Sequence, residues 1–205
     1  MSIILLWGGD GKTNQYLFGM INCMNDKNPW TTISTKTMYE NPWMRVREDE
    51  VIRPDGSGGI YGVMESKDSV VIVALNESNE VYLIRSFNYP VSTWSWGLPG
   101  GGGDGEEAEV ASKRELAEET GIIANKWTLL GKTRVSSGLM TERMAVLLAR
   151  DLSFGDRLDA DDKELISDGK FVSFEEIDKM IAVGEIDDAQ TVTGLYLVMR
   201  WLNRQ

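Results

Sequence analysis

Three glutamates near the middle of the chain have residue types and a spacing that suit metal chemistry. Glu115, Glu118 and Glu119 stand at positions i, i+3 and i+4, so a helix brings their side chains together on one face. Close carboxylates repel one another, and divalent cations bound between them relieve that repulsion. Because the ligand atoms are all oxygen, the predicted ion is Mg²⁺, with Mn²⁺ as the alternative.

The chain of 205 residues contains no histidine, which narrows the chemistry further. This removes most zinc sites, the Ser-His-Asp triad and the common imidazole base, so acid–base work falls to carboxylates. A solvated acidic face is the ordinary interpretation of a Glu-rich helix. Here Ala108 and Ala111 fall on the same side as the glutamates, which predicts that this face packs against other parts of the protein.

Glycines precede the glutamates. The stretch from Gly100 to Gly103, together with Gly105, lets the backbone bend sharply and approach a ligand closely. A carbonyl at Pro99 or Gly100 is therefore expected to complete the metal site.

Helix-forming residues fill positions 106–120, and Gly121 is the predicted left-handed end of this helix. Arg114 is interpreted as a structural residue that pairs with Glu106 or Glu118 and fixes the loop on the helix, with a phosphate contact as the alternative.

The order of these residues resembles the Nudix box. It reads Gly100, five residues, Glu106, seven residues, and then Arg114-Glu115-Leu116-Ala117-Glu118-Glu119-Thr120-Gly121-Ile122. With seven fixed residue types at roughly 7% usage each and two apolar positions, a chance match in the chain is on the order of one in ten million. The resemblance implies a magnesium-dependent hydrolase in which water attacks a diphosphate in line.

From about Trp30 to the C-terminus the chain resembles the ADP-ribose pyrophosphatase branch of the Nudix superfamily. This resemblance rests on residues 39–43 (Tyr-Glu-Asn-Pro-Trp), 54–56 (Pro-Asp-Gly) and 96–100 (Trp-Gly-Leu-Pro-Gly). It implies a homodimer in which the N-terminal strands, residues 31–65, exchange between two subunits. The implied substrate is ADP-ribose or a related nucleoside diphosphate sugar, cleaved to a nucleoside monophosphate and a sugar phosphate.

Two later segments resemble functional loops of that branch. In the segment 136–143, Glu142 is implied to face substrate and metal, and a charge at a hairpin end is the alternative. In the acidic run 159–164, Asp162 or Glu164 is implied to act as general base, with Glu115 in that role in some relatives. A solvated acidic loop is the alternative for this run.

The chain departs from the branch at one place. Where relatives usually have Gln-x-Arg before Tyr-Pro, this chain has Ser86-Phe87-Asn88 before Tyr89-Pro90. An arginine expected near the diphosphate is therefore absent, and Arg85 is the candidate to replace it. Trp96 is a candidate to stack on a base or sugar, although aromatics beside a strand more often belong to the core or an interface.

Hydrophobic patterning indicates the elements that position these residues. Five runs predict strands: 31–38, 43–52, 59–64, 70–75 and 81–85. Turn residues at 54–56 and 76–79 are expected to join neighbouring strands as antiparallel hairpins. Strands at 127–133, 144–148 and 170–172 follow the helix, and two helices begin near residues 173 and 187. The last helix is expected to have one apolar face: Val192, Leu195, Met199 and Leu202. This order predicts an α+β fold, and the resemblance implies an α/β/α sandwich with a mixed, largely antiparallel sheet.

Net charge, cysteine content and the N-terminal residues limit the domain organisation, the partners and the localisation. Residues 1–28 lack a clear period and are interpreted as an N-terminal extension, with one domain over residues 29–205. The net charge of −11 argues against nucleic acid as a partner. The single cysteine, Cys23, cannot form an internal disulfide, and the apolar residues 3–7 are too short for a secretory signal or a membrane span. We therefore expect a cytoplasmic protein that acts on a small molecule.

Competing interpretations fit less well. Gly100-x-Gly102-x-x-Gly105 matches a dinucleotide-binding pattern, but that pattern needs a parallel βαβ unit. Gly11-Lys12-Thr13 resembles the end of a phosphate-binding loop, yet Leu6 stands where its first glycine is required. A non-catalytic module that senses a nucleotide sugar remains the alternative function, and its usual mark is an eroded box. Isomerase chemistry on this fold would call for a Cys–Glu pair around the site.

Overall fold

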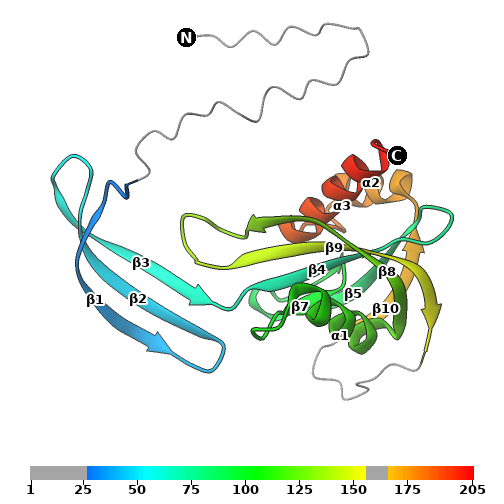
Figure 1. Ribbon diagram of the computed structural model, residues 1–205, viewed down its shortest axis with the longest axis horizontal. Coiled ribbons are helices and arrows are strands. Elements are labelled where there is room, and N and C mark those ends of the chain that lie inside the picture. Colours follow the sequence, from blue (N-terminus) through cyan, green and yellow to red (C-terminus); the bar gives the residue numbers. More distant parts are fainter. Residues whose placement is uncertain (1–26, 156–165) are drawn as a thin grey trace, which may run out of the picture.

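The computed structural model describes residues 27–155 and 166–205 (Figure 1). Nearly all of the expected N-terminal extension lies outside these ranges, as does Cys23. The acidic run 159–164 also lies outside them, so the general-base assignments to Asp162 and Glu164 remain predictions.

The first three strands form a separate antiparallel sheet, which we call the arm. It consists of β1 (Thr31–Glu40), β2 (Met44–Ile52) and β3 (Gly58–Ser66) in the order β1-β2-β3. Gly56 has φ 84° in the turn between β2 and β3, so the hairpin predicted at residues 54–56 is confirmed. Figure 1 shows the arm reaching away from the rest of the molecule.

The body contains two further sheets. One has the order β7-β4-β9-β8: Gly100–Gly102, Ser69–Ala74, Arg143–Phe154 and Ile122–Arg134. The other has the order β10-β5-β6: Ile166–Val172, Val81–Asn88 and Thr93–Gly97. Only the β4–β9 pair is parallel among the pairings of the described strands, which confirms the predicted mixed, largely antiparallel α+β architecture.

The hairpin predicted at residues 76–79 does not form as a paired ladder. A single bridge joins Leu75 to Val81, after which β4 and β5 enter different sheets. The reason is competition for partners, because β4 is already flanked by β7 and β9, whereas β5 is flanked by β10 and β6.

Three helices cover the body: α1 (Ala108–Thr120), α2 (Phe174–Ala182) and α3 (Ala189–Leu202). Gly121 ends α1 with φ 70°, as predicted. Helix α1 begins later than residue 106, because the Glu106 N–H bonds to the Gly103 carbonyl in a turn. Ser173 and Asp188 cap α2 and α3 by accepting hydrogen bonds from Glu176 N and Thr191 N. None of the helices in residues 27–155 and 166–205 is long and apolar enough to cross a membrane.

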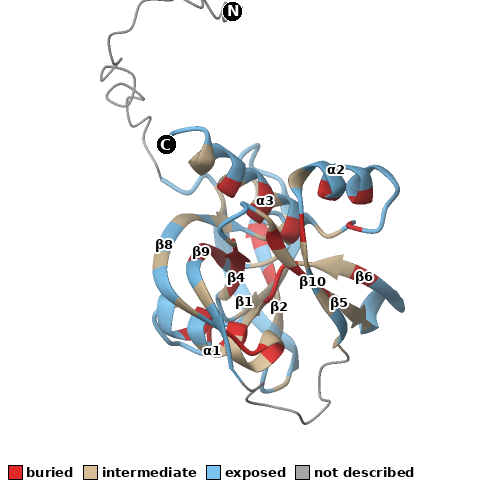
Figure 2. Ribbon diagram, turned by 90° about the vertical axis from the view of Figure 1, so that its right-hand side faces the viewer, coloured by how far each residue is buried: buried red, intermediate tan, exposed pale blue. Residues whose placement is uncertain are grey.

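Strand β4 separates two layers of core. Val70, Ile72 and Ala74 pack with α1, whereas Val71, Val73 and Leu75 pack with residues of α2 and α3. Figure 1 shows α1 on one side of the sheet and α2 and α3 on the other, and Figure 2 shows the buried residues of β4 between them. This arrangement is an α/β/α sandwich.

The apolar face predicted for α3 is only partly right. Leu195 is buried, but Val192 and Met199 are 40% and 41% exposed. The face that packs on the core is formed by Thr191, Gly194, Leu195 and Val198. Gly194 explains why the packed face of α3 is turned relative to the predicted one. A Cβ there would lie 2.5 Å from Leu98 Cδ1, so the helix approaches the sheet through its smallest residue.

Candidate functional site

The predicted metal-binding glutamates lie on the face of α1 that meets the sheet. Glu115 and Glu119 are each only 8% exposed, and Ala111, one turn before Glu115, is fully buried. Glu118 is half-buried. The expectation that this acidic face packs against protein is therefore confirmed, and carboxylates so far out of water need cationic or hydrogen-bonding partners.

Backbone glycines approach these carboxylates from β7. The N–H of Gly100 donates to Oε2 of Glu119 at 2.9 Å. A Cβ on Gly101 would lie 2.6 Å from the carboxylate of Glu115, so only glycine fits at this distance. The Pro99 carbonyl accepts a hydrogen bond from Ile72 N at 2.8 Å. This bond joins the residue before β7 to β4. The additional role of the Pro99 carbonyl as a metal ligand remains a prediction, as does that of Gly100.

Arg114 connects the loop to the helix through four acceptors. Its Nε donates to Glu106 at 3.2 Å, its Nη1 to Glu115 at 2.9 Å and Glu118 at 3.0 Å, and its Nη2 to the Gly102 carbonyl at 3.0 Å. Burial lowers the pKa of Arg114, but the charge of Glu115 and the three carboxylate hydrogen bonds outweigh it, so the net pKa is raised. The guanidinium therefore stays charged and holds two of the three glutamates in place.

The donor set of α1 fits a hard divalent ion. Three carboxylates stand within about one helical turn, two of them buried, and all ligand atoms are oxygen. Within the described ranges, no three acidic or cysteine side chains already converge as a set of metal ligands. Glu115 and Glu118 both lie within ion-pair distance of the Arg114 guanidinium.

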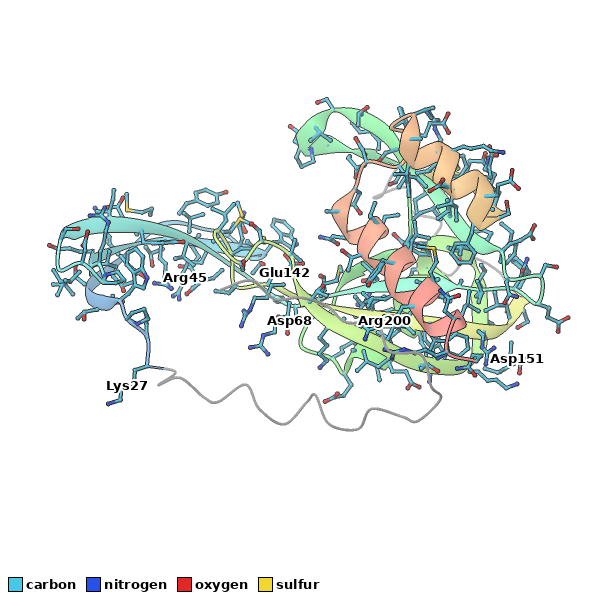
Figure 3. The ribbon with its side chains drawn as sticks, turned by 90° about the horizontal axis from the view of Figure 1, so that it is seen from above. Lys27, Arg45, Asp68, Glu142, Asp151 and Arg200 are labelled. Atoms are coloured by element: carbon cyan, nitrogen blue, oxygen red, sulfur yellow. The ribbon has the colours of Figure 1, made fainter. Side chains whose placement is uncertain are left out.

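Glu142 lies where the arm joins the body. Its Oε1 accepts from Ser69 Oγ at 2.6 Å and its Oε2 from Ser66 Oγ at 3.4 Å. The preceding loop pairs with β3 through Met64 N to Leu139 O and Thr141 N to Met64 O. Figure 3 shows Glu142 beside Asp68 at this junction, between Arg45 on the arm and Arg200 on the body. The side chain is thus hydrogen-bonded at the end of the β8–β9 hairpin, and its role facing substrate and metal remains a prediction.

A cavity of about 550 Å³ opens beside Glu119. This volume falls within the range typical of small-molecule sites. Its walls come from the β5–β6 hairpin, from Leu98 and Gly100, and from the N-terminal end of α3. Ser86 and Asn88, the two positions at which the sequence departs from its relatives, both line it, and Asn88 Nδ2 donates to Ser95 Oγ at 2.6 Å. Trp96 also lines the cavity, while Lys170 Nζ lies 4.6 Å from its ring centroid.

Arg85 was expected near the diphosphate as a replacement for the missing arginine. It is not among the residues that line this cavity, and its guanidinium lies 5.1 Å from the ring centroid of Trp94. Its cross-strand partner Trp96 does line the cavity. A contact of Arg85 with the diphosphate remains a prediction.

Several contacts of the site had no signal in the sequence. Ser69 and Glu142 are 73 residues apart, and the Asn88–Ser95 hydrogen bond crosses the β5–β6 hairpin. The Gly102 carbonyl as an acceptor for Arg114 was also not predicted. Serines and backbone carbonyls are too common for their positions alone to indicate such roles.

Comparisons with known proteins show what the chain is similar to. The model described as "Nucleoside diphosphate sugar hydrolase N-terminal domain" matches residues 30–64, and the NUDIX domain model matches residues 65–193. The ADP-ribose pyrophosphatase of Mycobacterium tuberculosis is 27% identical over 169 residues, which cover 82% of this chain and 82% of that protein. The ADP compounds hydrolase NudE of Escherichia coli is 25% identical over 178 residues, covering 85% and 94% of the two chains.

A solved structure of an ADP compounds hydrolase superposes with a TM-score of 0.75. The superposition covers 86% of this chain and 95% of the other, at 24% sequence identity. At that identity the likeness shows the fold alone.

Proposed function

The chain belongs to the Nudix family and is a Nudix pyrophosphohydrolase, and from this premise we propose that it cleaves nucleoside diphosphate sugars, with ADP-ribose as the first candidate. The observation that carries the proposal is the buried glutamate face of α1, held by Arg114 and by the Gly100 N–H. Support for the substrate class comes from the N-terminal family model and from the names of the relatives. The products are a nucleoside monophosphate and a sugar phosphate.

Glu115, Glu118 and Glu119, with the carbonyl of Pro99 or Gly100, are proposed to hold Mg²⁺, with Mn²⁺ as the alternative. When bound, the metal neutralises the diphosphate and makes a phosphorus more electrophilic. Burial of Glu115 and Glu119 supports this assignment, because bound cations offset the cost of keeping charged carboxylates out of water.

The hydrolytic step needs a base. Water adds its oxygen to one phosphorus, the bond from that phosphorus to the bridging oxygen breaks, and the water proton passes to a carboxylate. Glu115 and Glu142 are the candidates in the described part of the chain, and Asp162 and Glu164 are the candidates outside it. Glu142 is supported by its fixed position between Ser66 and Ser69.

A homodimer is proposed from the exposed apolar side chains of the arm. All ten residues of β1 are exposed, and Ile33, Trp43 and Ile60 are 57%, 78% and 66% exposed. Large exposed apolar side chains gathered on one small sheet favour an interface. We propose that the arm packs against a second copy of this chain.

The proposal is tested by incubating the purified full chain with Mg²⁺ and ADP-ribose, GDP-mannose, UDP-glucose or NADH in ¹⁸O-labelled water. Release of a nucleoside monophosphate, with ¹⁸O in one phosphate product, is expected. Absence of turnover across the panel contradicts the proposed hydrolysis. Tight binding of one compound without turnover, measured by calorimetry, would instead identify a sensing module.

A further inference from the structure

The cavity beside Glu119 has an unusual charge for an enzyme of phosphorylated substrates. Among the described residues that line it, the charged side chains are Glu119 and Asp188, and no lysine or arginine is present. Asp188 already accepts from Thr191 N at 2.8 Å, which satisfies one N–H at the start of α3. Even with Mg²⁺ held at Glu119, a phosphate or carboxylate inside this cavity would meet Asp188 and no lining lysine or arginine.

The hydrogen-bonding groups of the cavity suit hydroxyls. Ser86 and Ser95 face each other across the β5–β6 ladder, and Asn88 donates to Ser95, which is only 5% exposed. This bond fixes the Asn88 amide and leaves its carbonyl oxygen and its second N–H for a ligand. An amide both donates and accepts, as a sugar hydroxyl does, so the two groups are complementary.

Of the aromatic side chains that line the cavity, Phe87 and Trp96 are already engaged, whereas Tyr89 is 84% exposed. Phe87 packs edge-on against Trp94 with ring centroids 5.5 Å apart, and the Trp96 ring lies under Lys170. Stacking a nucleobase on these rings would displace existing contacts. At Phe87 and Trp96 the cavity therefore favours a hydroxyl-rich group over a planar aromatic one.

The position of the cavity decides which part of a substrate enters it. Glu119 is both a wall of the cavity and a proposed metal ligand, and Gly100 next to it donates to the same carboxylate. A diphosphate bound at the glutamates therefore places a directly attached group in the cavity.

We infer that this cavity is a neutral subsite for the sugar of the substrate, in which Asn88 determines specificity by accepting uncharged sugars and rejecting sugars that carry a phosphate or carboxylate. The inference rests on the proposed function, since it assumes that a nucleoside diphosphate sugar binds at Glu119. It narrows the substrate class to nucleoside diphosphates of neutral sugars.

Matched substrates that differ by one charge on the sugar test this inference. ADP-ribose is compared with ADP-ribose 1″-phosphate, and UDP-glucose with UDP-glucuronate, as ratios of kcat/KM with Mg²⁺. For the pair that is hydrolysed, wild type is expected to prefer the neutral sugar by about tenfold or more. Asn88→Arg should lower that ratio about tenfold, chiefly by improving turnover of the charged sugar.

Two further variants, a second charge change at Asn88 and a control at Asn125, check this result. Asn88→Asp preserves shape and adds negative charge, so it should widen the preference for neutral sugars even if Asn88→Arg folds poorly. Asn125→Arg makes the same charge change on the exposed part of β8 and should leave the ratio within about twofold of wild type.

The outcomes distinguish a failure of the sugar subsite from a failure of the proposed hydrolysis. Equal kcat/KM for both members of a pair, or a ratio unchanged in both Asn88 variants, overturns the subsite while leaving hydrolysis intact. If none of these four compounds, nor GDP-mannose or NADH, is hydrolysed, the proposed function and the subsite are overturned together.

Discussion

The backbone N–H of Gly100 lies 2.9 Å from Oε2 of Glu119, and this hydrogen bond joins the glycine strand β7 to helix α1 across 19 positions of the chain. A backbone donor cannot move independently of its strand. The carboxylate of Glu119 is consequently held at the boundary between the glutamate face and the cavity, where the proposed metal site and sugar subsite meet.

Glu119→Gln tests the proposed metal role of this residue. The amide oxygen of Gln can still accept from Gly100, so the fold should persist while the negative charge is lost. We expect kcat with Mg²⁺ to fall by about 100-fold or more, with little change in Tm. Glu109→Gln, an exposed residue of the same helix that pairs with Lys113, is the matched control. Unchanged kcat in Glu119→Gln would remove Glu119 from the metal site.

Gly101→Ala tests whether the approach of β7 positions Glu115. The added methyl would lie 2.6 Å from the Glu115 carboxylate, so the side chain must move. Activity is expected to fall by about tenfold or more, since small displacements of catalytic groups are costly. Gly102→Ala is the control, because an added Cβ there meets nothing within 4 Å. Similar kinetics for the two variants would argue against a role for this contact.

Arg114→Lys tests whether the hydrogen bonds of Arg114 hold the glutamates in place. Lysine retains the positive charge but cannot serve Glu106, Glu115, Glu118 and the Gly102 carbonyl together. Stability should fall by about 1–3 kcal/mol in denaturant unfolding, and kcat should fall more than KM changes. Lys113→Arg, at an exposed position next to it, should behave as wild type. A pure rise in KM would instead favour a phosphate contact by Arg114.

A double-mutant cycle tests whether Ser69 positions Glu142. Ser69→Ala removes the 2.6 Å hydrogen bond to Oε1, and we expect kcat/KM to fall by about tenfold. If Ser69 acts through Glu142, adding Ser69→Ala to Glu142→Gln should cost little more than Glu142→Gln alone. Ser66→Ala, whose hydroxyl is 3.4 Å from the carboxylate, should have the smaller effect. Fully additive losses would mean that the two residues act separately.

Ile33→Glu tests the proposed dimer. A charge at this exposed apolar position of β1 should weaken packing of the arm on a second chain. Sedimentation velocity should show a dimer for wild type at micromolar concentration and a shift toward monomer for the variant. Val183→Glu, 73% exposed at the end of α2, adds the same charge outside the arm and should remain dimeric. A monomeric wild type contradicts the proposal directly.

The sequence determined the features that depend on neighbouring residues. The i, i+3, i+4 spacing brings Glu115, Glu118 and Glu119 together because a helix repeats every 3.6 residues. The end of α1 at Gly121 and the turn at Gly56 follow from local backbone preferences in the same way. The order of strands and helices was sufficient to predict an α+β sandwich, and the missing histidines assigned the chemistry to carboxylates.

Tertiary structure alone decided the relationships between distant segments. Hydrophobic period did not predict that α3 would pack through Gly194, because that choice depends on the shape of Leu98 and the sheet beneath it. Nor did it show that Asn88 would line the cavity and donate to Ser95, because the register of β5 against β6 sets which residues of the two strands lie close together. The Ser69–Glu142 contact belongs to the same class, since chain folding across 73 positions creates it and no local pattern encodes it.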